Sequence, residues 1–397
     1  MTFEINGSPT PIEWAPTAFP LRYDVDQRVM RLHPTAVNVI ERAFAAWSSL
    51  PDTRIRFESR GVMAAAVPSG ESIAVTVADD LLAGQGAIAV TSYTFDTNTG
   101  RMLDADIRVD PSLFDGDVNA QMALAHEVGH TLGLDHSGVL TSIMYPYVGP
   151  ENLPPDLDTD DRIAISMIYP SADPMLLGAT LQGRVMGDHG GIYAAQVVAV
   201  SERGQPMGTV LTNAQGEFTL LGIPTGRYRL YAEPLDGPMI AESLQGTWRT
   251  AAMQSFPTEF YGATIDVENG KVYGNLMVNT AGAVRLNPRV IGVCAPDSNE
   301  VSLTSSPALV RPGQTVKLTV GGDGFISGMT EMEVLSPAFR RISDYQWWDG
   351  SVSATYVVDP DTPSASTIIL VRTGQETATL TGALRVYRTP KTCAVRK

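Results

Sequence analysis

The chain has 397 residues, of which 44% are hydrophobic and 18% are charged, so its composition is that of a globular protein and excludes a disordered one. The formal net charge of −15 argues against a nucleic-acid partner, because phosphate binding needs a basic surface. No apolar run reaches the roughly 18 residues of a membrane span, so no transmembrane segment is expected. The length predicts two or three domains at about 150 residues each.

The first part of the chain predicts a strand, a helix and then several strands. Residues 20–25 alternate like a strand, and residues 33–50 carry apolar side chains at helical spacing. Pro34 suits the first turn of that helix, and Thr35 is a candidate cap. Further strands are predicted at 53–59, 72–78, 86–95 and 101–110.

Two more helices follow, after which the pattern changes. One helix is expected to begin near Asp117 or Asn119 and to end at Gly133, and a second covers residues 157–169 with acidic residues in its first turn. From about residue 177 short alternating strands separated by turn sequences replace the helical periodicity. We therefore expect an α+β domain, a short linker and two all-β sandwiches, with these bounds: 1–170, 171–176, 177–282 and 283–397.

Three of the five histidines lie in one stretch, residues 123–137, with the sequence ALAHEVGHTLGLDHS. His126 and His130 are four residues apart and share one face of a helix. Gly133 permits a sharp turn that returns His136 to the same point. Three neutral imidazoles at about 2.0–2.1 Å from one ion, with a fourth position open to water, predict a zinc site. A core helix with hydrogen-bonded histidines is the competing interpretation, and the full HExxHxxGxxH spacing disfavours it.

The same stretch predicts a reaction. Bound zinc lowers the pKa of its water toward about 7 and polarises a carbonyl oxygen. Glu127 follows the first ligand and is not needed as a ligand itself, so it is the candidate general base. The predicted chemistry is amide hydrolysis by a zinc-bound water, with no covalent intermediate.

The motif resembles that of the metzincin zinc peptidases, which place a methionine turn below the metal. SIMYP, residues 142–146, supplies Met144, and Ser137 after the third histidine is similar to the matrixin branch. The likeness covers residues 12–170 and is greatest to bacterial secreted matrixins. It implies a catalytic domain with a twisted mixed sheet and three helices. Pro146 stands where some metzincins carry an additional tyrosine ligand, so no tyrosine ligand is expected.

The resemblance also implies a substrate cleft. Its edge strand, residues 86–92, would pair with substrate backbone through Ile88, Ala89 and Val90. Met122 would form the floor of the pocket for the side chain just after the scissile bond. The outer wall would consist of Tyr145, Pro146 and Tyr147, although the wall tyrosine is shifted relative to the usual pattern. Such a pocket predicts a preference for a medium-sized apolar side chain.

Three further expectations concern metals and latency. Only His33 and His189 remain outside the motif and they lie far apart, so a second, structural zinc is not expected. Structural Ca²⁺ is one interpretation of a cluster of oxygen-bearing side chains, and a plain acidic hairpin is the favoured one. That cluster consists of Asp96, Asn98, Asp104 and Asp106. No cysteine precedes position 294, which excludes latency by a thiolate within this chain.

The later segments resemble known accessory modules. Residues 177–280 are similar to carboxypeptidase-regulatory-like (transthyretin-like) domains through TNAQGEFTLLGIPTGRYRLYAE and FPTEFYG, and residues 285–393 to immunoglobulin-like or IPT/TIG modules through VRPGQTVKLTVGGDGF and GALRVY. The side chains expected in the second core are Phe218, Tyr228 and Leu230. Trp347 and Trp348 could form a binding patch, but part-buried packing is the favoured interpretation.

Two cysteines and the beginning of the chain bear on location. A disulfide between Cys294 and Cys393 is favoured over two unrelated buried thiols. The first residues lack the features of a signal peptide, so the protein is either cytoplasmic or has lost its leader. Accessory modules of this kind suggest an extracellular setting, and we therefore expect a secreted protein whose β-domains contact a surface or matrix ligand.

The leading hypothesis is a secreted zinc endopeptidase acting on protein or peptide substrates. The alternative is an extracellular binding or adhesion protein in which the peptidase module is latent or secondary. Exopeptidase action is a third hypothesis, and it would need a charged anchor for a chain terminus, which the sequence does not show near the motif.

Overall fold

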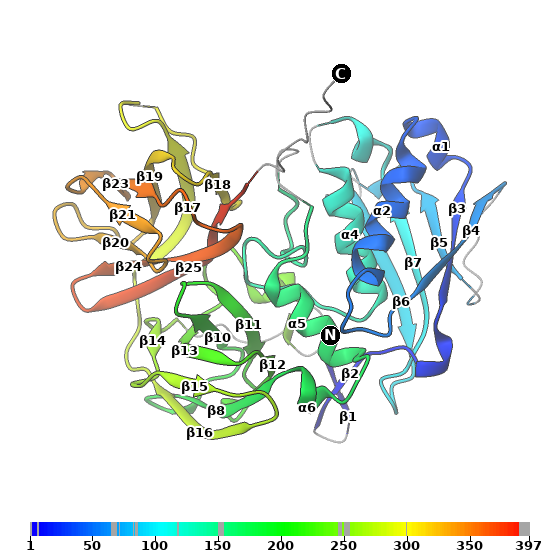
Figure 1. The fold of residues 1–397 in the computed structure, drawn as a ribbon, viewed down its shortest axis with the longest axis horizontal. Coiled ribbons are helices and arrows are strands. Elements are labelled where there is room, and N and C mark those ends of the chain that lie inside the picture. Colours follow the sequence, from blue (N-terminus) through cyan, green and yellow to red (C-terminus); the bar gives the residue numbers. More distant parts are fainter. Residues whose placement is uncertain are drawn as a thin grey trace.

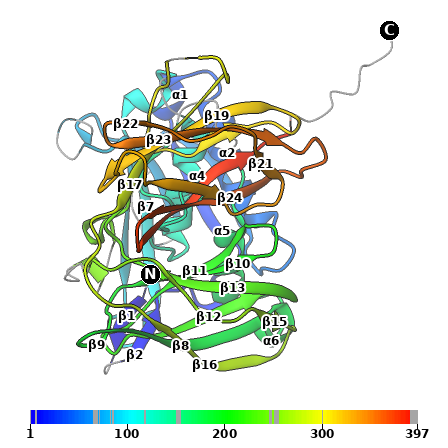
Figure 2. The same cartoon turned by 90° about the vertical axis from the view of Figure 1, so that its left-hand side faces the viewer.

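The computed structural model describes residues 2–5, 8–64, 70, 72–81, 83, 86–116, 119–149, 155–244, 248–249, 255–298 and 300–388. Its elements form three groups, which we call the first region (residues 2–170), the second region (174–279) and the third region (287–388) (Figure 1). The first region is a mixed sheet with helices, and the other two each consist of two sheets (Figure 2). The predicted fold class, an α+β part followed by two β-sandwich parts, is confirmed.

A five-stranded sheet forms the base of the first region, in the order β4-β3-β5-β7-β6. The edge strand β6 is antiparallel to its neighbour, and the other pairs are parallel. The strands in chain order are β3 (Leu21–Asp26), β4 (Phe57–Met63), β5 (Ile73–Val77), β6 (Ala89–Phe95) and β7 (Met102–Val109). A short hairpin of β1 (Thr2–Ile5) and β2 (Ser8–Pro11) precedes them.

The first region's two longest helices pack against each other. Helix α2 (Ala36–Ser48) buries an apolar face that includes Trp47, whose indole N–H donates to the carbonyl oxygen of Ala125 at 2.8 Å. Helix α4 (Ala120–Thr131) is capped at its N-terminus by Asn119, whose side chain accepts from the backbone N–H of Met122 at 3.0 Å. The other helical segments of the first region are η1 (Pro16–Ala18), α1 (Val29–Leu32), η2 (Pro111–Phe114) and α5 (Thr159–Ile168). Helix α6 (Pro174–Leu177) begins the second region.

Helix α2 is shorter than the predicted 33–50. His33 has extended backbone angles and Thr35 makes no side-chain cap, because the Thr35 hydroxyl pairs with Nδ1 of His33 at 2.9 Å. The final helix is close to its predicted bounds and begins with a capping box between Asp158 and Asp161. No helix in the described part of the chain is long and apolar enough to cross a membrane.

The second region has one sheet in the order β11-β10-β13-β14, with β15 also on β13, and another in the order β12-β8-β16 with β9 on β8. Phe218, Tyr228 and Leu230 lie in the core between these sheets, as predicted. The elements are β8 (Ala179–Gly187), β9 (Gly190–Gly191), β10 (Gln196–Ser201), β11 (Pro206–Leu211), β12 (Glu217–Ile223), β13 (Gly226–Glu233), η3 (Ala241–Ser243), β14 (Glu259–Phe260), β15 (Ile265–Val267) and β16 (Val272–Asn279).

The third region pairs sheet β17-β19-β23-β21, to which β22 adds, with sheet β18-β25-β24-β20. The tryptophan pair is divided between core and surface. Trp347 packs on the core and donates to the carbonyl of Thr330 at 2.7 Å, whereas Trp348 is 49% exposed. The strands are β17 (Asn287–Cys294), β18 (Ala308–Val310), β19 (Thr315–Asp323), β20 (Glu331–Val334), β21 (Phe339–Arg341), β22 (Gln346–Trp348), β23 (Ser351–Val358), β24 (Ala365–Thr373) and β25 (Glu376–Val386).

Cys393 lies outside the described residues, so the disulfide with Cys294 stays a prediction. The regions themselves are in contact. Helix α5 of the first region lies against β11 and β12 of the second, and β11 also contacts β24 of the third.

Candidate metal centre

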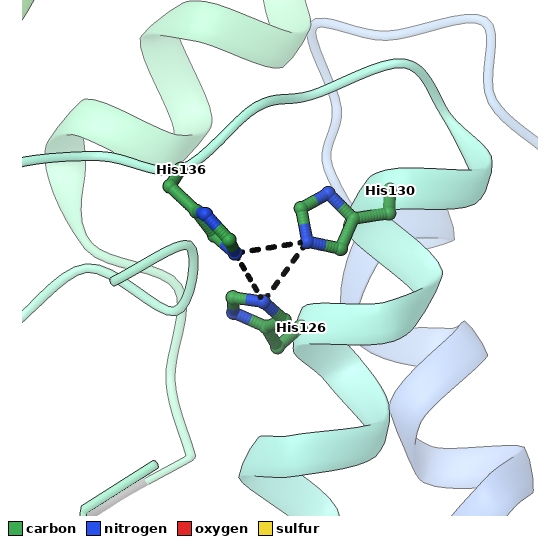
Figure 3. A group of neighbouring side chains, drawn as sticks. All are labelled: His126, His130 and His136. Atoms are coloured by element: carbon green, nitrogen blue, oxygen red, sulfur yellow. Dashed lines mark hydrogen bonds between the residues drawn. The ribbon is translucent and has the colours of Figure 1, made fainter. Parts of the chain in front are cut away.

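The three predicted ligands converge on one point. The Nε2 atoms of His126 and His130 are 3.0 Å apart, and each lies 3.2 Å from Nε2 of His136 (Figure 3). Three nitrogens bound tetrahedrally to one zinc at about 2.0–2.1 Å would be separated by about 3.3 Å, so the donor set fits a zinc ion. Among the described residues this is the one group of three or more His, Cys, Asp or Glu side chains arranged to hold a metal.

Each imidazole is oriented through its other nitrogen. Nδ1 of His126 lies 2.7 Å from the carbonyl oxygen of Ile143, and Nδ1 of His130 lies 2.8 Å from that of Leu134. Nδ1 of His136 is hydrogen-bonded to the carbonyl oxygen of Ser243. A carbonyl at Nδ1 requires the N–H there and leaves the Nε2 lone pair free for the metal.

Burial keeps these imidazoles neutral, which is the form that binds a metal. Desolvation lowers the pKa of His126 and of His136 to about 4, and it lowers the pKa of His130 well below its ordinary value. The bonds to the carbonyls of Ile143 and Ser243 oppose these shifts, but burial is the larger effect.

Glu127 is buried beside the ligands and has a partner, Thr91, that the sequence pattern does not indicate. The hydroxyl of Thr91 on β6 lies 2.6 Å from Oε2 of Glu127 and 2.9 Å from its backbone oxygen. Burial raises the pKa of Glu127 to about 7, and the bond from Thr91 opposes part of that shift. Thr91 directly follows the predicted substrate-pairing residues, but nothing in its residue type indicates contact with a helix thirty-six positions later.

Met144 lies under the helix that carries the ligands, and one glycine makes room for it. Met144 is 2% exposed. A Cβ at Gly129 of α4 would overlap the sulfur of Met144 and stand 2.9 Å from the Trp47 ring. The glycine inside HEVGH therefore permits the close approach of the methionine turn to α4.

The methionine turn is anchored by Asp161, a residue that the sequence analysis placed only in a helix. Its carboxylate accepts from the backbone N–H of Ile143 at 2.9 Å, of Met144 at 3.3 Å and of Asp158 at 2.8 Å. The hydroxyl of Ser142 donates to the same group. Burial raises the pKa of Asp161 to about 7. In the sequence, Asp161 is an acidic residue near the start of a predicted helix. That pattern does not show whether the side chain only caps its own helix or also binds the methionine turn.

The predicted substrate residues come from the edge strand β6, from α4 and from the segment after the methionine turn. Ala89 and Val90 belong to the edge strand β6, which contacts α4, and Ile88 directly precedes that strand. Met122 is buried on α4. Pro146 follows the methionine turn and Tyr147 is 48% exposed.

Tyr145 differs from the expected pocket wall, because its side chain is 1% exposed. It packs against apolar side chains of the second region, namely Leu235, Met239 and Leu244. Its ring meets that of Tyr147 edge-on at 5.7 Å, so Tyr147 alone of the two presents substantial surface.

The residues considered for Ca²⁺ are dispersed over a hairpin. Asp96 and Asn98 lie in the turn between β6 and β7, where Oδ1 of Asp96 accepts from the backbone N–H of Asn98 at 2.8 Å. Asp104 and Asp106 lie on β7, and Asp106 accepts from the backbone N–H of Ala74 at 2.8 Å. Asp96 bonds within its own turn and Asp106 bonds to strand β5. The plain acidic hairpin stays the favoured prediction, with Ca²⁺ as the alternative.

Comparison with known proteins agrees with this geometry. Residues 13–170 match the family model described as matrixin. Metalloendoproteinase 4-MMP of Arabidopsis thaliana is 32% identical over 89 residues, 21% of this chain and 26% of that protein. Matrix metalloproteinase-B of Caenorhabditis elegans is 26% identical over 182 residues, which are 38% of this chain and 34% of that protein. Karilysin of Tannerella forsythia is 34% identical over 93 residues, 19% of each. This chain thus spans about a third or less of each relative's length.

Solved structures resemble the chain only loosely. The major pilin subunit of Bacillus cereus is 10% identical with a TM-score of 0.18, covering 51% of this chain and 66% of that one. Titin domains in complex with telethonin are 14% identical with a TM-score of 0.15, covering 53% and 94%. Likeness at this level carries no argument about the fold. The family match and the histidine triad together identify residues 13–170 as a matrixin domain, the catalytic domain of a family of zinc metalloendopeptidases.

Proposed function

We propose that this protein is a secreted endopeptidase that hydrolyses peptide bonds in proteins, with zinc held by His126, His130 and His136. The observation that carries the proposal is the convergence of the three Nε2 atoms within 3.0–3.2 Å of one another beside a buried glutamate. When bound, zinc would supply a Lewis acid that polarises the scissile carbonyl and acidifies water.

Glu127 acts as the general base in this proposal and passes the proton to the leaving amine. The Thr91 hydroxyl, 2.6 Å from Oε2, fixes the rotamer of the carboxylate and leaves Oε1 for the reacting water. Neutral, buried imidazoles hold their lone pairs toward the metal without needing protonation changes during turnover.

Substrate would bind as an added strand along β6, with Ile88, Ala89 and Val90 next to its backbone. The antiparallel edge position of β6 and its contact with α4 support this placement. A pocket bounded by Met122, Pro146 and Tyr147 would favour an apolar side chain just after the scissile bond. Tyr145 would contribute indirectly, by supporting the ring of Tyr147 through an edge-on contact.

The two β-regions would deliver this activity to a surface or matrix ligand. In the proposed organisation the catalytic domain covers 1–170, the linker 171–176, and the accessory domains 177–282 and 283–397. The two-sheet cores of the second and third regions, each with its own buried cluster, support that division.

The test is hydrolysis of casein or gelatin by zinc-loaded full-length protein. Glu127→Ala should lower kcat/KM by about 10²- to 10⁴-fold while metal content is unchanged. Glu41→Ala, an exposed glutamate on α2, is the matched control and should retain activity. Undiminished hydrolysis by Glu127→Ala would contradict the mechanism. A zinc-loaded wild type that cuts no polypeptide would favour the alternative, a binding or adhesion protein with a latent peptidase module.

A further inference from the structure

The loop that follows the third histidine, residues 137–145, is enclosed by both β-regions. Gly138 lies directly against the carboxamide of Gln196 on β10, so that even a Cβ there would overlap it. The backbone N–H of Leu140 donates to the carbonyl of Thr381 on β25 at 2.9 Å. This part of the matrixin domain is therefore fixed by residues that lie far outside the family match.

An acidic side chain connects the same loop to the second region. Asp160 of α5 accepts from the hydroxyl of Ser137 at 2.6 Å and also from the backbone N–H of Thr209 on β11 at 2.8 Å. Asp160 is 5% exposed, so these bonds are shielded from water. The residue after His136 is thus tied through Asp160 to the β-sheet next to it.

A small apolar cluster joins the loop to the segment between β13 and β14. Leu140 and Tyr145 pack with Leu235, Met239 and Leu244, and all five side chains are less than 5% exposed. Leu244 directly follows the short helix η3, whose last residue is Ser243. Burial of Leu244 therefore sets the position of the Ser243 carbonyl.

That carbonyl orients a zinc ligand. The Nδ1 partners of His126 and His130 belong to the matrixin domain itself, whereas the partner of His136 is Ser243, which comes 107 residues later. Partners of this kind fix the tautomer and direction of a metal-bound imidazole, and losing one typically weakens metal binding by about 10- to 100-fold.

We propose that the segment 239–244 of the second region is a positioning element of the zinc site, which holds His136 through the backbone carbonyl of Ser243. The matrixin domain then depends on its neighbour to complete the metal centre. This inference rests on the zinc site of the proposed function and deepens it, because it makes the β-region part of the catalytic apparatus.

The experiment measures the zinc affinity of the full chain by competition with a chelator. Leu244→Ala removes the buried anchor and should weaken zinc binding by about tenfold or more. Ser243→Ala keeps the backbone carbonyl and should bind zinc like wild type. Leu318→Ala truncates a fully buried leucine in the third region's core and controls for lost stability, so its zinc affinity should also be unchanged.

A spectroscopic readout accompanies the affinities. In the zinc-loaded wild type and in Ser243→Ala, the Nδ1–H proton of His136 should be slow to exchange in histidine-labelled NMR spectra, and in Leu244→Ala it should exchange rapidly. Equal zinc affinity of Leu244→Ala and wild type would overturn the proposal, as would equal weakening by Leu244→Ala and Leu318→Ala. Failure of the wild type to bind zinc would instead refute the proposed function.

Discussion

Helix α4 and the loop after it hold the zinc ligands in different ways. On α4, the spacing of His126 and His130 follows from helical geometry, and their second nitrogens find partners within the same domain. His136 lies beyond the helix, in a loop whose position is set by Asp161, by the second region and by the third. The comparison shows that helical geometry places His126 and His130, whereas tertiary contacts place His136. The imidazole of His126 also depends on the loop, through the carbonyl of Ile143. Substitutions in the helix and in the loop should separate these effects.

Removing the carboxylate of Asp161, which anchors the loop, should have the largest effect on stability. Asp161→Ala leaves the buried N–H groups of Ile143 and Asp158 without their acceptor, and each such loss costs about 1–3 kcal/mol. We expect the free energy of unfolding to fall by about 3 kcal/mol, measured by denaturant titration of the zinc-free protein.

Asp161→Asn is the matched variant, because a carbonyl oxygen at the position of Oδ2 can still accept from the N–H groups of both Ile143 and Asp158. The free energy of unfolding of Asp161→Asn should therefore lie much closer to that of wild type than the value for Asp161→Ala does. If Asp161→Ala lowered the free energy of unfolding by less than about 1 kcal/mol, this carboxylate would not be what fixes the loop. The contrast between ligand placement by α4 and by the loop would then lose its main evidence.

The same division explains what the sequence could predict. The convergence of His126 and His130 follows from spacing and residue type, because an i, i+4 pair shares one face of a helix. The helix predicted from Asp117 or Asn119 to Gly133 is α4, Ala120–Thr131. The fold class follows equally from the change in periodicity near residue 177. Ser243 could not be predicted, since it acts through a backbone carbonyl and any residue type would serve.

Other features could not be predicted for the same reason. The burial of Tyr145 depends on how the second region packs against it. The partnership of Thr91 with Glu127 needs the register of β6 against α4, which single-sequence patterns do not specify. Helix α2 begins later than predicted because His33 and Thr35 bond to each other. Local rules thus predict elements, and contacts between distant elements decide the rest.

Substituting the glycine where α4 meets the methionine turn should have the second largest effect. Gly129→Ala places a methyl group against the sulfur of Met144 and the ring of Trp47, and overpacking of this kind costs about 1–3 kcal/mol. The cost should exceed any gain from helix propensity, which is about 1 kcal/mol. Thermal unfolding measures it, with Gly262→Ala as control because a Cβ there meets open space. An unchanged or raised Tm for Gly129→Ala would show that helix and turn are not closely packed.

The junction that encloses the loop should make stability depend on pH. Glu233 is buried among Gln196, Thr379 and Thr381, and burial raises the pKa of its carboxyl to about 7, from 4.5. Between these values the folded state binds one more proton than the unfolded state, so the free energy of unfolding should fall as pH rises from 4.5 to about 7, by up to about 1.4 kcal/mol per pH unit.

Glu233→Gln removes the titrating group. The slope of the free energy of unfolding against pH between 4.5 and about 7 should therefore become smaller by that amount, as measured by urea unfolding at a series of pH values. Glu242→Gln, at an exposed site, should leave the profile as it is in wild type. If Glu233→Gln kept the wild-type slope, the buried carboxyl at this junction would not be the titrating group.

The smallest effect on stability is expected from a substitution that separates a side-chain hydrogen bond from a backbone hydrogen bond between α5 and the second region. Thr209 donates to Oδ1 of Asp160 through both its hydroxyl, at 3.0 Å, and its backbone N–H, at 2.8 Å. Thr209→Val removes only the hydroxyl, so unfolding should become easier by about 1 kcal/mol, against no change for the exposed Thr219→Val. Zinc affinity should change far less than in Leu244→Ala, because Asp160 keeps the Thr209 N–H and Ser137, and the carbonyl that orients His136 is untouched. A loss of zinc affinity as large as that of Leu244→Ala would place the control of His136 at α5 and not at Ser243.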